Sequence, residues 1–309
     1  MKLKKVLAII GPTAVGKTAL SLQLAKQFNG EIISGDSMQV YRGLDIGTAK
    51  ILPDERAGIP HYLIDIRDVN QRYSVADFVA EATQLISEIT NRGGLPIIVG
   101  GTGFYLKALL YQMNLGGDHY DETENNRQKW HQFATEQGQT ALWQRLNELD
   151  PAAAQNIPVS NERRVVRALE VYERTGTRFS EQQTELLPRY DAYVVGLNTD
   201  RAVLYERINQ RVDLMMHTGL LDEARQLYAQ GGRQWQSGKG IGYRELFEYF
   251  DGQLTQAAAV DKIKLDTRHY AKRQLTWFRH QIPVHWYDLI EDQQAQKQIG
   301  TDILTWLKN

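Results

Sequence analysis

An eight-residue segment near the N-terminus constrains the fold of this chain more than any other feature. The letters G-P-T-A-V-G-K-T at positions 11–18 match the pattern G-x-x-x-x-G-K-[ST] at every fixed position. An apolar run of strand length, Val6 to Ile10, precedes the segment, and apolar residues at helical spacing follow it. This context predicts a phosphate-binding loop (P-loop) rather than a glycine-rich turn without a ligand. The predicted phosphate-binding residues are Gly11, Pro12, Thr13, Ala14, Val15, Gly16, Lys17 and Thr18.

Each part of the P-loop has a physical task. Glycines let the backbone curl so that successive N–H groups point inward, and the start of the following helix adds the positive end of its dipole. Lys17 supplies a positive charge for terminal phosphates, and Thr18 offers its hydroxyl to a magnesium ion. The sequence therefore predicts Mg²⁺ as the cofactor, with Thr18 as its ligand. The pattern alone leaves open which phosphate compound binds, ATP included.

A later strand departs from the usual arrangement of ATPases and GTPases. Those enzymes usually carry an acidic residue after a second apolar strand, where it holds magnesium. Here the run Ile97 to Val99 ends in Gly100-Gly101-Thr102. This departure weakens the interpretation as a simple nucleotide hydrolase, and it favours a diphosphate that acts as a leaving group.

Hydrophobic patterning predicts the fold class α/β. Strands alternate with helices in the first third of the chain, which is typical of a parallel sheet with helices on both faces. The expected strands are 6–10, 31–34, 62–66 and 96–99, and the expected helices include the segment after the P-loop and 75–90. Together with the P-loop, this pattern predicts a P-loop NTPase-like sheet.

The second half predicts an all-helical insertion before the sheet resumes. Residues 117–190 contain helical patterns but no convincing strand, and the apolar run 192–197 returns to the sheet. Asp200 is expected to cap a helix through Met216. The expected domains are a first core part, 1–116; a helical insertion, 117–190; and a second core part with basic C-terminal helices, 191–309.

Asp36 follows the second predicted strand. The carboxyl ends of parallel strands meet at the ligand crevice of such a sheet, so Asp36 is expected near the P-loop. There it could bind magnesium or accept a proton from a nucleophile. Spacing alone leaves open the simpler alternative, an aspartate that only forms a turn or caps a helix.

Composition excludes several classes of protein. Cysteine is absent from the 309 residues, so disulfides and cysteine-rich zinc sites are impossible. The formal net charge of −1 excludes a globally basic nucleic-acid binder but not a local basic face. No secretory signal and no apolar stretch of membrane-spanning length is present. We therefore expect a soluble, cytoplasmic protein that has no membrane partner.

Eight segments in order along nearly the whole chain resemble those of the bacterial tRNA dimethylallyltransferase family, also called tRNA isopentenyltransferases. This combination is far more specific than the P-loop alone. The segments are G-P-T-A-V-G-K-T from Gly11, I-S-G-D-S-M-Q-V-Y-R-G-L-D-I-G-T-A-K from Ile33, P-H-Y-L-I-D-I-R-D from Pro60, V-G-G-T-G-F-Y-L-K-A-L from Val99, R-R-V-V-R-A-L-E-V from Arg163, R-I-N-Q-R-V-D-L-M from Arg207, G-I-G-Y-R-E-L from Gly240 and A-K-R-Q-L-T-W-F-R from Ala271.

The resemblance implies a reaction and its partners. The dimethylallyl group of dimethylallyl diphosphate would move to N6 of the adenosine 3′ of the anticodon, in the anticodon stem-loop of a tRNA. A monomer is expected. The family pattern makes Asp36 the general base and places Arg211, Lys17 and Thr18 at the diphosphate. It assigns the following residues to tRNA contact: Asp36, Ser37, Met38, Gln39, Thr102, Arg127, Arg163, Arg164, Val165, Val166, Arg167, Lys239, Gly240, Ile241, Gly242, Tyr243 and Arg244.

Alternative interpretations remain beside this one. A P-loop kinase for a small metabolite would use Asp36 to activate a hydroxyl and would consume ATP. An adenylate isopentenyltransferase would accept free nucleotides, and a nucleic-acid-binding module would use the P-loop only as a nucleotide sensor. Arg163, Arg164 and Arg167 in isolation fit a solvated helix face, whereas the family pattern favours RNA contact.

Overall fold

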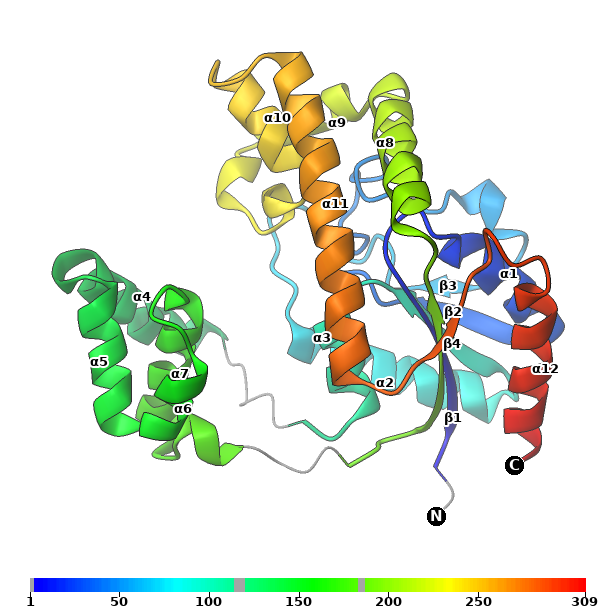
Figure 1. The fold of residues 1–309 in the computed structure, drawn as a ribbon, viewed down its shortest axis with the longest axis horizontal. Helices are drawn as coiled ribbons and strands as arrows, with labels where there is room; N and C mark the ends of the chain where they lie inside the picture. Colours follow the sequence, from blue (N-terminus) through cyan, green and yellow to red (C-terminus); the bar gives the residue numbers. More distant parts are fainter. Residues whose placement is uncertain (1–2, 114–119, 183–186) are drawn as a thin grey trace. The chain divides into compact units, whose positions relative to one another are not determined.

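The computed structural model describes residues 3–113, 120–182 and 187–309 (Figure 1). The chain divides into a larger unit, residues 1–111 and 188–309, and a smaller unit, residues 112–187. The sequence places the first domain boundary at 116/117, which lies outside the described residues.

Six parallel strands form the sheet of the larger unit, in the order β3-β2-β4-β1-β5-β6. β1 lies between β4 and β5, so the strand that leads into the P-loop is central. The strands are β1 (Lys5–Ile10), β2 (Gly30–Ser34), β3 (His61–Tyr62), β4 (Leu95–Gly100), β5 (Asp191–Leu197) and β6 (His285–Tyr287). The predicted α/β class and parallel sheet are confirmed.

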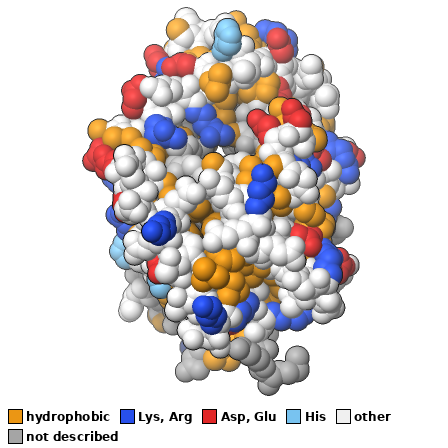
Figure 2. Space-filling view, turned by 90° about the vertical axis from the view of Figure 1, so that its right-hand side faces the viewer, with side chains coloured by type: hydrophobic (Ala, Val, Ile, Leu, Met, Phe, Trp, Pro, Cys, Tyr) orange, Lys and Arg blue, Asp and Glu red, His pale blue; other side chains and the backbone are white. Residues whose placement is uncertain are grey.

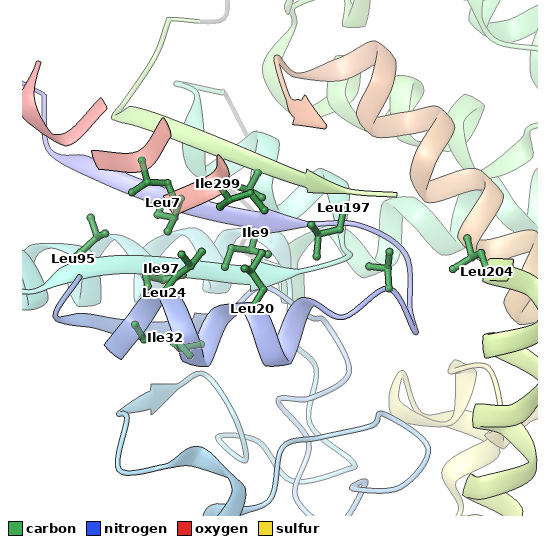
Figure 3. Close-up of a cluster of buried hydrophobic side chains, with 14 of the residues drawn as sticks. Leu7, Ile9, Leu20, Leu24, Ile32, Leu95, Ile97, Leu197, Leu204 and Ile299 are labelled. Atoms are coloured by element: carbon green, nitrogen blue, oxygen red, sulfur yellow. The ribbon is translucent and has the colours of Figure 1, made fainter. Parts of the chain in front are cut away.

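Helices cover both faces of this sheet. Leu7 and Ile9 of β1 point into a cluster with Leu20 and Leu24 of helix α1 (Figure 3). Side chains alternate along a strand, so Ala8, which is also fully buried, faces the opposite side. The helices of this unit are α1 (Lys17–Gln27), α2 (Val75–Asn91), α3 (Gly103–Leu110), α8 (Arg201–His217), α9 (Leu220–Ala229), α10 (Tyr243–Phe250), α11 (Gln256–Gln281) and α12 (Ala295–Lys308), with short 3₁₀ turns η1 (Pro53–Arg56), η3 (Gly232–Gln234) and η4 (Ser237–Lys239).

The structure differs from the sequence prediction at two strands. The strand predicted at 62–66 ends at Tyr62, because Leu63 and Asp65 have positive φ angles of 60° and 57°, which an extended strand cannot contain. The strand β6 was not predicted. It has three residues and pairs with β5 at the edge of the described sheet, so it carries almost no periodic signal. The Asp200 cap is confirmed, since its carboxylate accepts from the backbone N–H groups of Ala202 and Val203.

Helices also make up the smaller unit, around a hydrophobic core of its own that includes Trp130, Leu142 and Leu169. Its helices are α4 (Tyr120–Gln137), α5 (Gln139–Leu149), α6 (Pro151–Asn156), α7 (Glu162–Thr175) and the 3₁₀ turn η2 (Phe179–Gln182). Across the described parts of the whole chain, no helix is long and apolar enough to cross a membrane.

Candidate active site

The P-loop joins β1 to α1 and needs glycine at its two fixed positions. Gly11 has a φ of 147°, and a Cβ there would lie 2.6 Å from the carbonyl oxygen of Leu197 on the neighbouring strand. Gly16 is left-handed, with a φ of 101°, directly before α1 begins. Glycine tolerates both conformations without a steric penalty. The motif therefore encodes the backbone path that turns N–H groups toward a ligand.

The side chain of Lys17 is hydrogen-bonded to the backbone at the start of the P-loop. Its Nζ donates to the carbonyl oxygens of Gly11 at 2.9 Å and Pro12 at 2.6 Å. Burial lowers the pKa of Lys17 to about 8, against the opposing effect of the Asp36 charge; the Arg211 charge lowers it further. These interactions show that residues from three separate elements converge at the P-loop, as the topology of the sheet predicts.

Asp36 lies just beyond the end of β2. Its Oδ1 accepts from the backbone N–H of Met38 at 2.8 Å, so it does form a turn. Burial raises the pKa of its carboxyl, while the N–H groups of Met38 and Gln39 and the charge of Lys17 act in the opposite direction. Asp36 therefore forms a turn and also lies near Lys17. A carboxylate with a raised pKa is a stronger proton acceptor than an ordinary aspartate.

Helix α8 brings two arginines to the P-loop. Arg207 donates from Nε to the carbonyl oxygen of Ala14 at 2.9 Å, a contact that the sequence did not single out. The Nε of Arg211 is buried and has no hydrogen-bond partner within the described structure. Burial, followed by the charge of Arg207, lowers the pKa of Arg211. A buried guanidinium N–H without an acceptor is costly, so this position suits an anionic ligand.

Thr18 is exposed in the first turn of α1. Among the residues described, no cluster of three or more His, Asp or Glu could hold a metal by itself. Magnesium in phosphate-binding enzymes is usually held by one or two protein oxygens, with the rest supplied by phosphates and water. Thr18, an exposed residue that carries a hydroxyl at the P-loop, fits a magnesium ion that arrives with a diphosphate.

Thr102 and helix α11 complete the surroundings of Asp36. The Oγ1 of Thr102 accepts from the backbone N–H of Ser37 at 3.3 Å. Tyr270 interacts with the Thr102 side chain, and burial, reinforced by the Asp36 charge, raises the pKa of its phenol to about 12. Gln274, one turn further on, donates to the carbonyl oxygen of Gly101 at 2.9 Å. The sequence predicts only basic C-terminal helices here and does not single out Tyr270 or Gln274; their spacing of four places both on one helix face but does not show what that face contacts.

The two predicted tRNA-contact segments of the larger unit, 36–39 and 239–244, lie against each other. A Cβ on Gly240 would lie 2.8 Å from Cε of Met38. Lys239 and Arg244 are exposed, whereas the side chain of Tyr243 is only 1% exposed. Tyr243 is thus too buried for its ring to contact RNA directly.

The predicted contacts of the smaller unit divide into three groups. Arg163 and Arg164 are exposed on α7. Val165 and Val166 are buried in the helical core, so their side chains stabilise the unit rather than face a ligand. The remaining two arginines share a buried carboxylate. Arg127 lies 3.0 Å and Arg167 lies 3.3 Å from the oxygens of Glu170.

Comparisons with known proteins agree on one family. A family model described as IPP transferase matches residues 39–281. A tRNA dimethylallyltransferase of Limosilactobacillus fermentum is 59% identical, over 98% of this chain and 99% of its own. The crystal structure of a tRNA isopentenylpyrophosphate transferase from Bacillus halodurans has a TM-score of 0.75 and 47% identity, over 99% of this chain and 97% of its own. A structure of a eukaryotic dimethylallyltransferase acting on tRNA has a TM-score of 0.82 and 31% identity, over 98% of this chain and 80% of its own.

Proposed function

Because this chain belongs to the IPP transferase family, we propose that it transfers the dimethylallyl group from dimethylallyl diphosphate to N6 of an adenosine in tRNA. The acceptor would be the adenosine 3′ of the anticodon, and the products N6-dimethylallyladenosine and diphosphate. The observation that carries the proposal is the convergence of Lys17, Asp36 and Arg211 at a P-loop. The proposed setting is the cytoplasm, where the tRNA is.

The P-loop would bind the diphosphate that leaves. Cleavage of the allylic C–O bond places negative charge on the diphosphate and positive charge on the allyl carbon. The loop N–H groups and the cations Lys17 and Arg211 stabilise that negative charge. The Nε of Arg211, which has no partner among the described residues, gains an acceptor. A magnesium ion held by Thr18 and the phosphates would supply further charge neutralisation.

Asp36 would accept the proton that the adenine amine loses. The amine lone pair is delocalised into the ring, so the nitrogen is a poor nucleophile until a base removes its proton. As the N–C bond forms and the C–O bond breaks, that proton moves to the Asp36 carboxylate. Burial raises the pKa of this carboxyl, which makes it a better acceptor.

The RNA contacts in this proposal come from exposed cations. The chain has a net charge of −1, and Lys and Arg side chains are interspersed with Asp and Glu over the face in Figure 2. Binding of an anionic RNA must therefore rely on local groups. Arg163 and Arg164 of the smaller unit and Lys239 of the larger unit are exposed and suited to phosphate contact.

One incubation tests the proposal against its rivals. The protein is mixed with labelled dimethylallyl diphosphate, magnesium and unmodified tRNA, and parallel samples contain ATP or free AMP. We expect label in the tRNA and no ATP consumption. Label in AMP alone would indicate an adenylate isopentenyltransferase, ATP consumption with a small acceptor a kinase, and tRNA binding without transfer a binding module.

A further inference from the structure

Glu223 of helix α9 holds a loop that is remote from it in the sequence. Its Oε2 accepts from the backbone N–H groups of Asp45 at 2.7 Å and Ile46 at 2.8 Å, and its Oε1 accepts from that of Gly47 at 2.8 Å. Three successive N–H groups aimed at one anion form a nest, which binds a carboxylate more strongly than a single neutral donor can.

A fourth donor joins this carboxylate to the segment 239–244. The hydroxyl of Tyr243 donates to Oε1 of Glu223 at 2.7 Å. A Cβ on Gly47 would lie 2.5 Å from that hydroxyl oxygen, so the two segments meet closely. The carboxylate of Glu223 therefore links the loop 45–47 to the segment 239–244.

The loop held by Glu223 is in turn connected to the segment that contains Asp36. Gln39 donates from Nε2 to the carbonyl oxygen of Thr48 at 3.2 Å. The buried Nζ of Lys50 donates to the carbonyl oxygen of Tyr41 at 2.8 Å and pairs with Asp45 and Asp65, both at 2.6 Å. One chain of polar contacts therefore runs from Gln39 through the loop to Glu223 and Tyr243.

We propose that Glu223 is a positioning residue that holds segments 36–39 and 239–244 together as one tRNA-binding surface. This inference rests on the proposed function. Glu223 contacts segment 239–244 directly through the buried phenol of Tyr243. It acts on segment 36–39 through the loop 45–47, whose N–H groups it binds and whose neighbour Thr48 accepts from Gln39. The turn of Asp36 has separate supports, since Met38 donates to its carboxylate and Gly35 donates to the Val99 carbonyl oxygen at 2.8 Å. Loss of Glu223 should therefore weaken tRNA use more than the chemical step.

The main test is Glu223→Gln, which preserves size but replaces one acceptor oxygen by an NH₂ group that faces N–H or O–H donors. We expect KM for tRNA to rise roughly tenfold or more, the effect of buried donors without an acceptor. We expect kcat at saturating tRNA and KM for dimethylallyl diphosphate to stay within about twofold, by the independence of distant groups. The matched control is Asp222→Asn, the same change on the adjacent residue, whose exposed carboxylate pairs only with Arg225 in the described structure.

Tyr243→Phe provides a milder variant, because it removes one hydrogen bond and keeps the nest. It should raise KM for tRNA by several-fold, as expected for one hydrogen bond to a charged group. If Glu223→Gln does not fold, this variant decides the question. An unchanged KM for tRNA, or an equal loss in KM for both substrates and in kcat, would overturn the inference. Wild-type transfer to tRNA is measured in the same series, so a failure of the proposed function is recognised separately.

Discussion

The P-loop and helix α7 both carry residues that the sequence assigns to contact with phosphate groups. The two regions differ in how far the local sequence determines what each residue does. In the P-loop, backbone conformation fixes the role, since Gly11 and Gly16 adopt angles that few other residues tolerate. In α7, three arginines lie within five consecutive residues but differ in their surroundings. Arg163 and Arg164 are exposed, whereas Arg167 pairs with the buried Glu170. A local sequence motif therefore reveals a requirement on the backbone conformation. It does not reveal which group a long, positively charged side chain will pair with.

The largest expected effect is that of a substitution at Asp36, next to the P-loop. Asp36→Asn keeps an acceptor for the N–H of Met38 but removes the basic carboxylate. We expect kcat to fall roughly 10²–10⁴-fold, the usual contribution of a positioned general base, while tRNA binding persists. The measurement is kcat at saturating concentrations of both substrates, beside tRNA affinity. A near-normal kcat would leave Asp36 with a structural turn only.

Arg211→Ala should have the next largest effect. Removal of one preorganised charge from the leaving group is expected to lower kcat/KM for dimethylallyl diphosphate by about 10²–10³-fold. Arg201→Ala, an exposed arginine on the same helix, is the matched control. Weaker tRNA binding with normal use of the diphosphate would instead assign Arg211 to the RNA.

The pH dependence of the reaction follows from the shifted pKa values of Lys17 and Asp36. Lys17 is charged below its pKa of about 8, so kcat/KM for dimethylallyl diphosphate should fall about tenfold for each unit of pH above 8. Asp36 must be ionised, and its raised pKa places the acid limb above the ordinary aspartate value of about 3.9. A pH series of kcat/KM measures both limbs. An alkaline limb that begins near 10.5, the ordinary lysine value, would show that Lys17 is not desolvated.

The smallest expected effect is that of substitutions on helix α7. Replacement of Arg163 and Arg164 by Ala should weaken tRNA binding several-fold and flatten its salt dependence, by a log–log slope of about 0.7–0.9 for each lost phosphate contact. Affinity for dimethylallyl diphosphate should not change. Arg145→Ala, whose exposed arginine pairs with Glu148 in the same unit, is the control. The same slope in both variants would mean that Arg163 and Arg164 form a merely solvated face.

Sequence patterns predicted the parallel sheet and the P-loop because both depend on local periodicity and on glycine. They also placed Asp36 near the P-loop, since parallel strands end at one edge. They missed the partner of Arg207, a carbonyl oxygen of the P-loop, and the nest around Glu223, because residues joined in these contacts are more than 170 positions apart. The periodicity of a helix or a strand gives no information about contacts between residues so far apart in the sequence.

The strand predicted over 62–66 shows a different limit. Its apolar letters fit an extended strand, but Lys50 pairs with Asp65, whose φ of 57° is incompatible with that strand. The charges of α7 show a third limit. Sequence grouped Arg167 with Arg163 and Arg164, and only the packed structure shows that Glu170 is buried beside Arg167 and Arg127.

The central claim is that this P-loop holds a leaving diphosphate and not a phosphoryl donor. The most direct measurement follows one reaction and quantifies both products, with diphosphate assayed enzymatically and the tRNA digested to nucleosides for mass spectrometry. The account predicts one diphosphate released for each N6-dimethylallyladenosine formed, with or without ATP. Transfer of phosphate from ATP to an acceptor, or release of diphosphate without a prenylated adenosine, would contradict it.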